Sequence, residues 1–143
     1  MSALKRKEAR ELALGLLFET EFKPEENPIA VFAVSSENRE IPEDEYIKGA
    51  YFGVCENRDE IDDIIGKNLK GWKTHRLTKV SRSILRLAVY EMLYCKDIPY
   101  SVSINEAVEL AKKFDDPKAR AFINGALNSI KVSLEADGNI KND

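Results

Sequence analysis

Apolar residues recur at the spacing of an α-helix along most of the chain, and no segment shows the alternation typical of a β-strand. The least regular part is 23–42, where the pattern allows a short helix near 28–34. Elsewhere it predicts helices over residues 3–22, 43–56, 58–69, 79–95, 103–114 and 117–134. The predicted fold class is therefore all-α, a compact bundle of about seven helices.

The helix predicted over 79–95 is apolar around nearly its whole circumference, which is typical of the central helix of a bundle. Arg86 lies on this helix, so it is expected either to join a basic surface or to be paired inside the core. Short polar residues and prolines mark where helices begin. The expected starts are Pro42, Asn57 with Glu60, Thr78, Ser103 with Glu106, and Asp116 followed by Pro117.

The first predicted helix opens with cations, namely Lys5, Arg6, Lys7 and Arg10. The start of a helix carries partial positive charge, so each exposed cation there costs about 0.3–1 kcal/mol. Folding alone would favour Asp or Glu in this turn. An external anion would offset the cost, and RNA phosphate is the obvious candidate. The alternative is a basic helix end that contacts only water.

Charge is segregated along the chain, although the net charge is only −3. Residues 19–63 hold fourteen acidic and four basic side chains, whereas residues 67–86 hold seven basic and no acidic ones. Local patches therefore say more about partners than the average does.

The cysteines and the hydropathy indicate the compartment. Cys55 and Cys95 lie far apart without metal-ligand spacing, which is typical of a reducing environment. The basic start does not lead into a signal-peptide pattern, and no apolar run approaches the roughly 20 residues of a membrane helix. A cytoplasmic protein without membrane association is expected.

The sequence offers little that could support catalysis. The single histidine, His75, lies in a basic loop without an evident partner, and the carboxylate clusters lack the spacing of a metal loop or an acid–base pair. Glycines are scattered within helical pattern rather than grouped in a phosphate-binding loop. We therefore expect no enzymatic activity, no cofactor and no metal. Gly125, inside the last predicted helix, is best explained by close helix packing.

A second cation cluster surrounds the junction 114–117 between the last two helices. Its members are Lys112, Lys113, Lys118 and Arg120. Phe122 follows Lys118 by one helical turn, and cations beside an aromatic ring can bind single-stranded RNA by phosphate contact and base stacking. Spacing alone, however, better explains Phe122 as a core residue.

Five segments of the chain resemble a known family, the transcription antitermination proteins called NusB. They are KRKEARE at 5–11, VSRSILRLAVYEML at 80–93, IPY at 98–100, SINEAVELAKKF at 103–114 and FINGAL at 122–127. Residues 23–77 match only in helical pattern. The resemblance implies a helical RNA-binding domain of two packed subbundles, assigned here to residues 1–134. The polar composition of residues 135–143 predicts a flexible tail.

The resemblance also implies a function. The family binds the boxA element of nascent ribosomal RNA transcripts, as single-stranded RNA, together with a ribosomal small-subunit protein called NusE. This complex joins RNA polymerase and other Nus factors and opposes termination.

By position, the resemblance assigns candidate contacts in this chain. The RNA contacts are Lys5, Arg6, Lys7, Arg10, Lys113, Lys118 and Phe122. The NusE contacts surround the start of the helix after Thr78 and are Arg76, Ser81 and Ile84. Two positions depart from the family pattern, because Ser81 stands where an acid is frequent and Lys118 where some relatives carry an acid. The cation at 118 should favour anion binding.

Two alternatives come from other classes of protein. One is a homo-oligomeric interaction module, for example a homodimer, whose basic face is covered by a second copy. The other is an accessory domain that works with a ribosomal RNA-modifying enzyme, since NusB-like domains also occur fused to ribosomal RNA methyltransferases.

Overall fold

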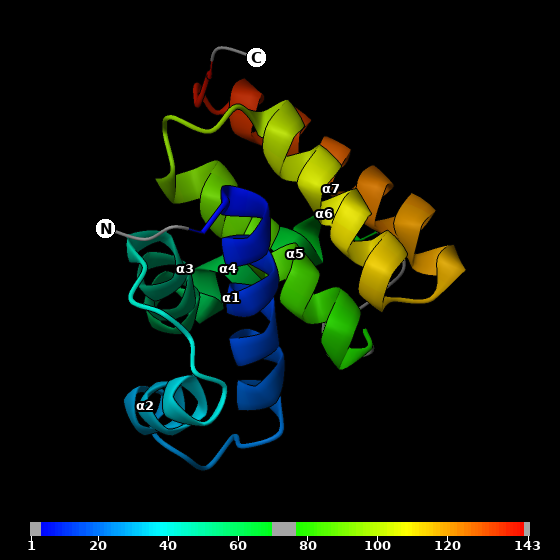
Figure 1. Ribbon diagram of the computed structural model, residues 1–143. Coiled ribbons are helices and arrows are strands. Elements are labelled where there is room, and N and C mark those ends of the chain that lie inside the picture. The colour runs from blue at the N-terminus through cyan, green and yellow to red at the C-terminus, as the bar shows by residue number, and fades with distance from the viewer. Residues whose placement is uncertain (1–3, 70–76, 142–143) are drawn as a thin grey trace. The chain divides into compact units, whose positions relative to one another are not determined.

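The computed structural model describes residues 4–69 and 77–141, and within them it contains seven α-helices and no strand (Figure 1). The helices are α1 (Arg6–Glu21), α2 (Pro28–Asn38), α3 (Glu45–Glu56), α4 (Arg58–Lys67), α5 (Lys79–Tyr94), α6 (Tyr100–Phe114) and α7 (Pro117–Ala136). The all-α prediction is confirmed. The chain divides into two compact units, unit 1 (Met1–Asn57) and unit 2 (Arg58–Asp143), in agreement with the two expected subbundles.

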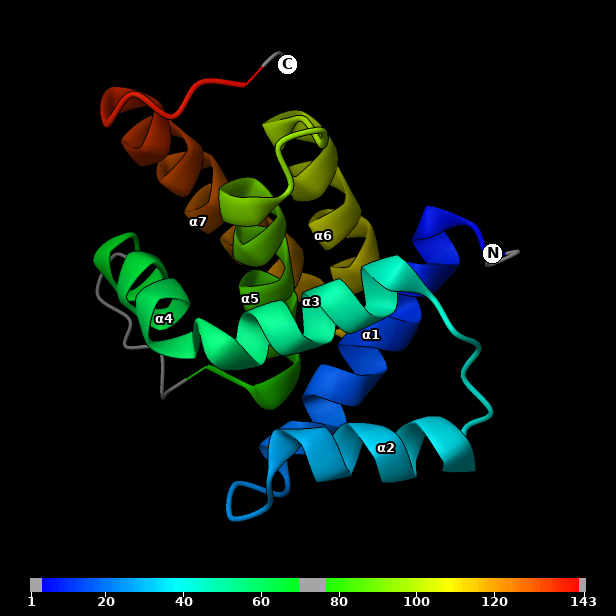
Figure 2. The same ribbon diagram turned by 90° about the vertical axis from the view of Figure 1, so that its left-hand side faces the viewer.

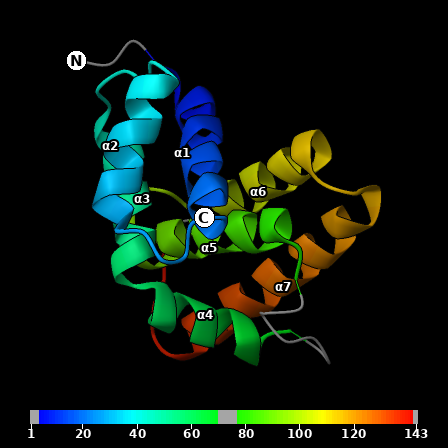
Figure 3. The same cartoon turned by 90° about the horizontal axis from the view of Figure 1, so that it is seen from below.

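Unit 1 is built around α1, which packs against both α2 and α3 (Figures 2 and 3). The ring of Tyr51 on α3 is completely buried, and Phe32 of α2 lies 5.0 Å from it between ring centroids. The Tyr51 hydroxyl donates to the Pro28 carbonyl at 2.9 Å and lies 2.8 Å from the Thr20 hydroxyl. Burial raises the pKa of Tyr51 to about 12. One phenol thus ties all three helices together.

Unit 2 is organised by α5, which contacts α4, α6 and α7 (Figure 1). Ile84, Leu85 and Val89 on this helix are completely buried, as predicted for a central helix. Arg86 is also buried, and its Nε and Nη2 each donate to a carboxylate oxygen of Asp62 at 2.8 Å. Of the two expectations for Arg86, internal pairing is the one the structure supports.

Two predicted helix starts are confirmed. The Thr78 hydroxyl accepts a hydrogen bond from the Ser81 backbone N–H at 3.1 Å and caps α5. The Asp116 carboxylate accepts from the Lys118 N–H at 2.9 Å, and Pro117 occupies the first position of α7. In both cases the donor and the acceptor lie within three residues of each other, so the cap could be predicted from the sequence without knowledge of the fold.

The other predicted starts are wrong. The helix α6 begins at Tyr100, and the hydroxyl of Ser103 donates to the buried Glu91 carboxylate at 2.7 Å instead of capping. Asp44 caps α3, so Pro42 precedes that helix. The Asn57 side chain donates back to the Gly53 carbonyl at 2.8 Å and closes α3, with no cap contact to α4. The side chains of Asn57 and Ser103 do not cap the following helix, because the Gly53 carbonyl of α3 and the Glu91 carboxylate of α5 accept hydrogen bonds from them instead.

The structure also moves the start of the predicted tail. The helix α7 continues to Ala136, and Gly138, with φ at +91°, reverses the chain. The Lys141 ammonium then donates to the carbonyls of Glu91, Cys95 and Ile98 at 3.1, 2.9 and 2.9 Å. It therefore satisfies carbonyls at and just beyond the C-terminal end of α5, where a cation is favourable. Residues 142–143 lie outside the described part.

The Arg86–Asp62 pair gives a stability prediction. Arg86→Met removes two charge-assisted hydrogen bonds and leaves the Asp62 carboxylate without its partner, so we expect the free energy of unfolding to fall by about 2–3 kcal/mol. Urea unfolding measures this change. Lys67→Ala is the matched control, because Lys67 and Asp63 form an exposed pair on α4 at 3.0 Å, with an expected loss below about 0.5 kcal/mol. Equal losses in both variants would contradict the assignment.

Candidate nucleic-acid interface

The first candidate surface is the start of α1. Lys5 is the N-cap residue, and Lys5, Arg6 and Lys7 are all exposed. The single acid of this turn, Glu8, lies 3.4 Å from the Lys5 backbone N–H, a long hydrogen bond. Three cations therefore lie at the positive end of the helix dipole, as the sequence predicts.

Arg10 differs from the other three cations. Only 5% of its surface is exposed, and its guanidinium lies over the ring of Tyr46 on α3, with Cζ 5.8 Å from the ring centroid. Arg6 lies over the same ring at 4.6 Å but remains exposed. The Arg10 side chain is therefore used inside unit 1, and the expectation that it contacts RNA stays a prediction. Helical spacing placed Arg6 and Arg10 on one face and could not separate their roles.

The second candidate surface is the junction between α6 and α7. Asp115 holds this junction, since its carboxylate accepts hydrogen bonds from the Ser81 hydroxyl at 2.6 Å and from the Asp116 N–H at 2.8 Å. Lys113 and Lys118 on either side of it are exposed, as are Lys112 and Arg120. The cation cluster expected from the sequence is therefore present on the surface of unit 2.

An aromatic residue that the sequence did not single out lies in this cluster. The ring of Phe114, the last residue of α6, is 46% exposed, and the Lys113 ammonium lies 5.5 Å from its centroid. Phe114 lies at helical spacing from the buried residues Ala107, Leu110 and Ala111 of α6. Its place beside two lysines at the very end of the helix was the signal that could have indicated exposure.

Phe122 is half-buried, so it is neither a full core residue nor a free surface ring. It lines a shallow hollow of about 350 Å³ between the end of α4 and α7, together with Asn68, Leu69 and Gly125. The Ser129 hydroxyl donates to the Asn68 side-chain carbonyl at 2.8 Å across this hollow. An aromatic ring at the edge of an open depression can be reached by another flat group.

Gly125 requires a correction. Close helix packing was expected there, but a Cβ atom built on Gly125 meets no neighbouring atom of residues 4–69 and 77–141 within 4 Å. The glycine instead leaves the hollow beside Phe122 open.

The predicted NusE contacts are not surface residues where the structure describes them. Ser81 is buried and bonded to Asp115, and Ile84 has no exposed surface, so neither side chain is available to a partner. Arg76 lies outside the described residues. Lys79, Val80 and Arg82 are the half-exposed residues of the same turn of α5. Because α5 is central, only a narrow part of its first turn reaches the surface.

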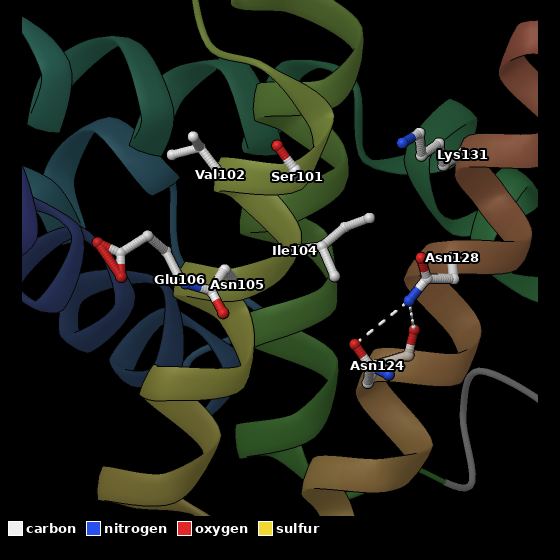
Figure 4. A pocket seen from close by; sticks show the side chains of 8 residues that line it. All are labelled: Ser101, Val102, Ile104, Asn105, Glu106, Asn124, Asn128 and Lys131. Atoms are coloured by element: carbon white, nitrogen blue, oxygen red, sulfur yellow. Dashed lines mark hydrogen bonds between the residues drawn. The ribbon is translucent and has the colours of Figure 1, made fainter. Parts of the chain in front are cut away.

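A further hollow, of about 560 Å³, lies between α6 and α7 (Figure 4). Asn105, Asn124 and Asn128 line it, and the Asn128 amide donates to the main-chain and side-chain oxygens of Asn124 at 2.8 and 3.2 Å. Asn124 follows Phe122 by two residues, which places it on the other side of α7. The charged lining residues are Glu106 and Lys131, one anion and one cation, so this hollow lacks the excess of positive charge that the lysine clusters have.

Two negative findings concern residues 4–69 and 77–141. They contain no group of three or more His, Cys, Asp or Glu side chains placed to hold a metal ion. None of their helices combines the length and apolar character that a membrane crossing needs.

Comparison with known proteins identifies the family. The NusB family matches residues 7–131. The transcription antitermination protein NusB of Bacillus cereus (strain B4264) is 45% identical over 132 residues, covering 92% of this chain and all of that protein. The chain therefore belongs to the NusB family.

Solved structures agree with this assignment. NusB of T. maritima superposes with a TM-score of 0.78 at 34% identity, over 90% of this chain and 92% of that one. A chain from the crystal structure of antitermination factors NusB and NusE in complex with double-stranded RNA gives 0.79 at 33% identity, over 90% and 96%.

The open space at Gly125 gives a prediction. Gly125→Ala should raise the free energy of unfolding by about 1 kcal/mol, because alanine is the better helix former and its methyl group meets no neighbour in the described part of the chain. Thermal unfolding with a urea series measures the change. The matched control is Gly138→Ala, which should destabilise because its positive φ strains any side chain. A loss of stability in Gly125→Ala would show a contact that the geometry does not contain.

Proposed function

We propose that this chain is an RNA-binding transcription antitermination factor that acts together with the ribosomal protein NusE. The observation that carries the proposal is the row of exposed cations Lys5, Arg6 and Lys7 at the positive end of α1. Membership of the NusB family supports it, as does the solved relative in complex with NusE and double-stranded RNA.

Electrostatics explains why these cations favour RNA. The cations are repelled by the positive end of the helix dipole, so they destabilise this end of α1. Phosphate groups bound there would be attracted both to the cations and to the helix end, and the arrangement would become favourable. Arg6 lies over Tyr46, which restricts its guanidinium before RNA arrives. Part of the conformational entropy cost of binding is therefore met in the free protein.

The α6–α7 junction supplies a second proposed RNA-binding surface, on unit 2. Lys113 and Lys118 would contact phosphates, while the rings of Phe114 and Phe122 would stack on bases. Stacking requires unpaired bases, so the proposed ligand is a single-stranded boxA-type element rather than a regular duplex. Arg10 is left out of the contacts, since its role is to hold α1 on α3 through Tyr46.

The protein partners follow from the family. NusE is proposed to contact unit 2 near the exposed part of the first turn of α5, around Lys79 and Arg82. RNA polymerase and other Nus factors would be reached through the RNA–NusE complex. The chain would act by binding rather than by catalysis, in the cytoplasm where nascent transcripts are made.

The α1 cations give the direct test. Replacing Lys5, Arg6 and Lys7 by alanine should weaken binding to a boxA-type RNA and reduce the slope of log K against log salt, because fewer counterions are released. Fluorescence anisotropy at several salt concentrations measures both quantities, with a scrambled RNA and a duplex as comparison ligands.

The control variant replaces Lys23, Arg58 and Lys96 by alanine, which changes the net charge equally elsewhere on the chain. It should bind almost normally. If both triple variants lose the same affinity, only the net charge matters and the α1 site is refuted.

Phe122 gives the second test. Phe122→Ala should cost about 1–3 kcal/mol of RNA binding through lost stacking, and less stability than the roughly 3–5 kcal/mol of a fully buried phenylalanine. The control is Phe52→Ala, which removes a half-buried ring that packs against Tyr51 in unit 1. This variant should lose stability without losing RNA affinity. Normal affinity of folded Phe122→Ala would return this residue to a packing role.

A further inference from the structure

Helix α2 exposes its apolar side. Ile29 is 66% and Val34 is 54% exposed, and Ala30 and Ala33 are exposed as well. At 100° per residue these four positions and Glu37 form one continuous arc of the helix surface. Single exposed apolar residues are ordinary, but a contiguous apolar face on a surface helix indicates an interaction site.

The buried side of α2 shows the opposite departure. Ser35 is buried next to the exposed Val34, and the hydroxyl oxygens of Ser35 and Ser36 are buried without a hydrogen-bond partner among the described residues. Burying an unpaired hydroxyl destabilises a fold, and so does leaving a large apolar side chain in water. A helix arranged for folding alone would place its serines outward and Val34 inward. Departures of this kind are expected where a surface serves a partner.

The apolar arc is bordered by acidic side chains. Glu25 and Glu26 precede α2, Glu37 lies on the arc, and Glu40 follows the helix; all four are exposed. None of the four forms an ion pair within residues 4–69 and 77–141. The cations nearest to them in sequence are Lys23, two residues before Glu25, and Arg39, which is bound to Glu19 of α1 at 3.1 Å. The face therefore combines an apolar centre with four exposed carboxylates at its ends, which outnumber the two flanking cations.

We propose that this face of α2 is a docking surface for a basic polypeptide segment. The segment would place apolar side chains against Ile29, Ala33 and Val34, and Lys or Arg side chains against Glu26 and Glu37. Charge complementarity selects this occupant. The site goes beyond the proposed RNA function, because the glutamates repel phosphate.

Other occupants fit the charges poorly. A second copy of the chain docked on the same face would bring its own glutamates against these by two-fold symmetry. An anionic lipid surface would be repelled in the same way as RNA. Only a cationic amphipathic partner satisfies both the apolar arc and its acidic borders.

The test uses the full chain and a fluorescently labelled amphipathic helical peptide of leucine and lysine. A peptide of the same pattern with glutamate in place of lysine is the comparison probe. Anisotropy titrations should show binding of the leucine–lysine peptide and little binding of the leucine–glutamate peptide. The variant Ile29→Ser with Val34→Ser should bind at least tenfold more weakly, with its helicity checked by circular dichroism.

The matched control is Val132→Ser with Ile140→Ser, which removes two other strongly exposed apolar side chains and should bind normally. Glu26→Lys with Glu37→Lys changes surface charge only and should also weaken binding, which keeps the test decisive if the serine variant folds poorly. Equal binding of both peptides, or wild-type affinity in the α2 variants, would overturn the proposal. Self-association that the serine variant abolishes in sedimentation would assign the face to a second copy instead.

Discussion

The burial of α5 is the constraint on which unit 2 depends. A helix surrounded on nearly all sides takes polar groups out of water, and each group left without a partner costs stability. On α5 the buried Ser83 hydroxyl has no partner among the described residues, whereas three other buried polar side chains do. Arg86 is bonded to Asp62 on α4, Glu91 to Ser103 on α6, and Ser81 to Asp115 at the α6–α7 junction. Lys141 satisfies the carbonyls at the other end of the helix. The polar residues of α5 thus fix its neighbours in register.

This arrangement links stability to the proposed RNA surface. The bond from Ser81 to Asp115 fixes the point where α6 ends, and the exposed lysines and Phe114 lie directly beside that point. A loop held only by its own backbone would present these side chains over a wide range of positions. Anchoring the junction to the central helix reduces that range, so less entropy is lost when RNA orders the same side chains.

The sequence predicted those features whose interactions lie within a few residues of one another. Helix content, the central position of α5 and the caps at Thr78 and Asp116 belong to this group. Ser103 and Asn57 carry equally good local signals, but a buried carboxylate and a neighbouring carbonyl compete for their side chains. Arg10 could not be told from Arg6, because the ring that separates their roles comes from α3. The family resemblance assigned candidate contacts by position, without indicating whether each side chain is exposed. Ile84 was assigned in this way, and its side chain is completely buried.

Unit 1 carries two surfaces of opposite character, and each departs from what folding alone would favour. Cations lie at the positive end of α1, whereas α2 turns valine and isoleucine outward and serine inward. Lys5 is the N-cap of α1, and Arg6 and Lys7 lie in its first turn. Arg39 at the end of α2 lies against Gly15 and Glu19, further along the same helix. A phosphate backbone and a basic polypeptide would therefore be drawn to different parts of unit 1. Opposite charge keeps the two ligands from competing for one site, and this is the physical condition for a small helical protein to hold RNA and protein together.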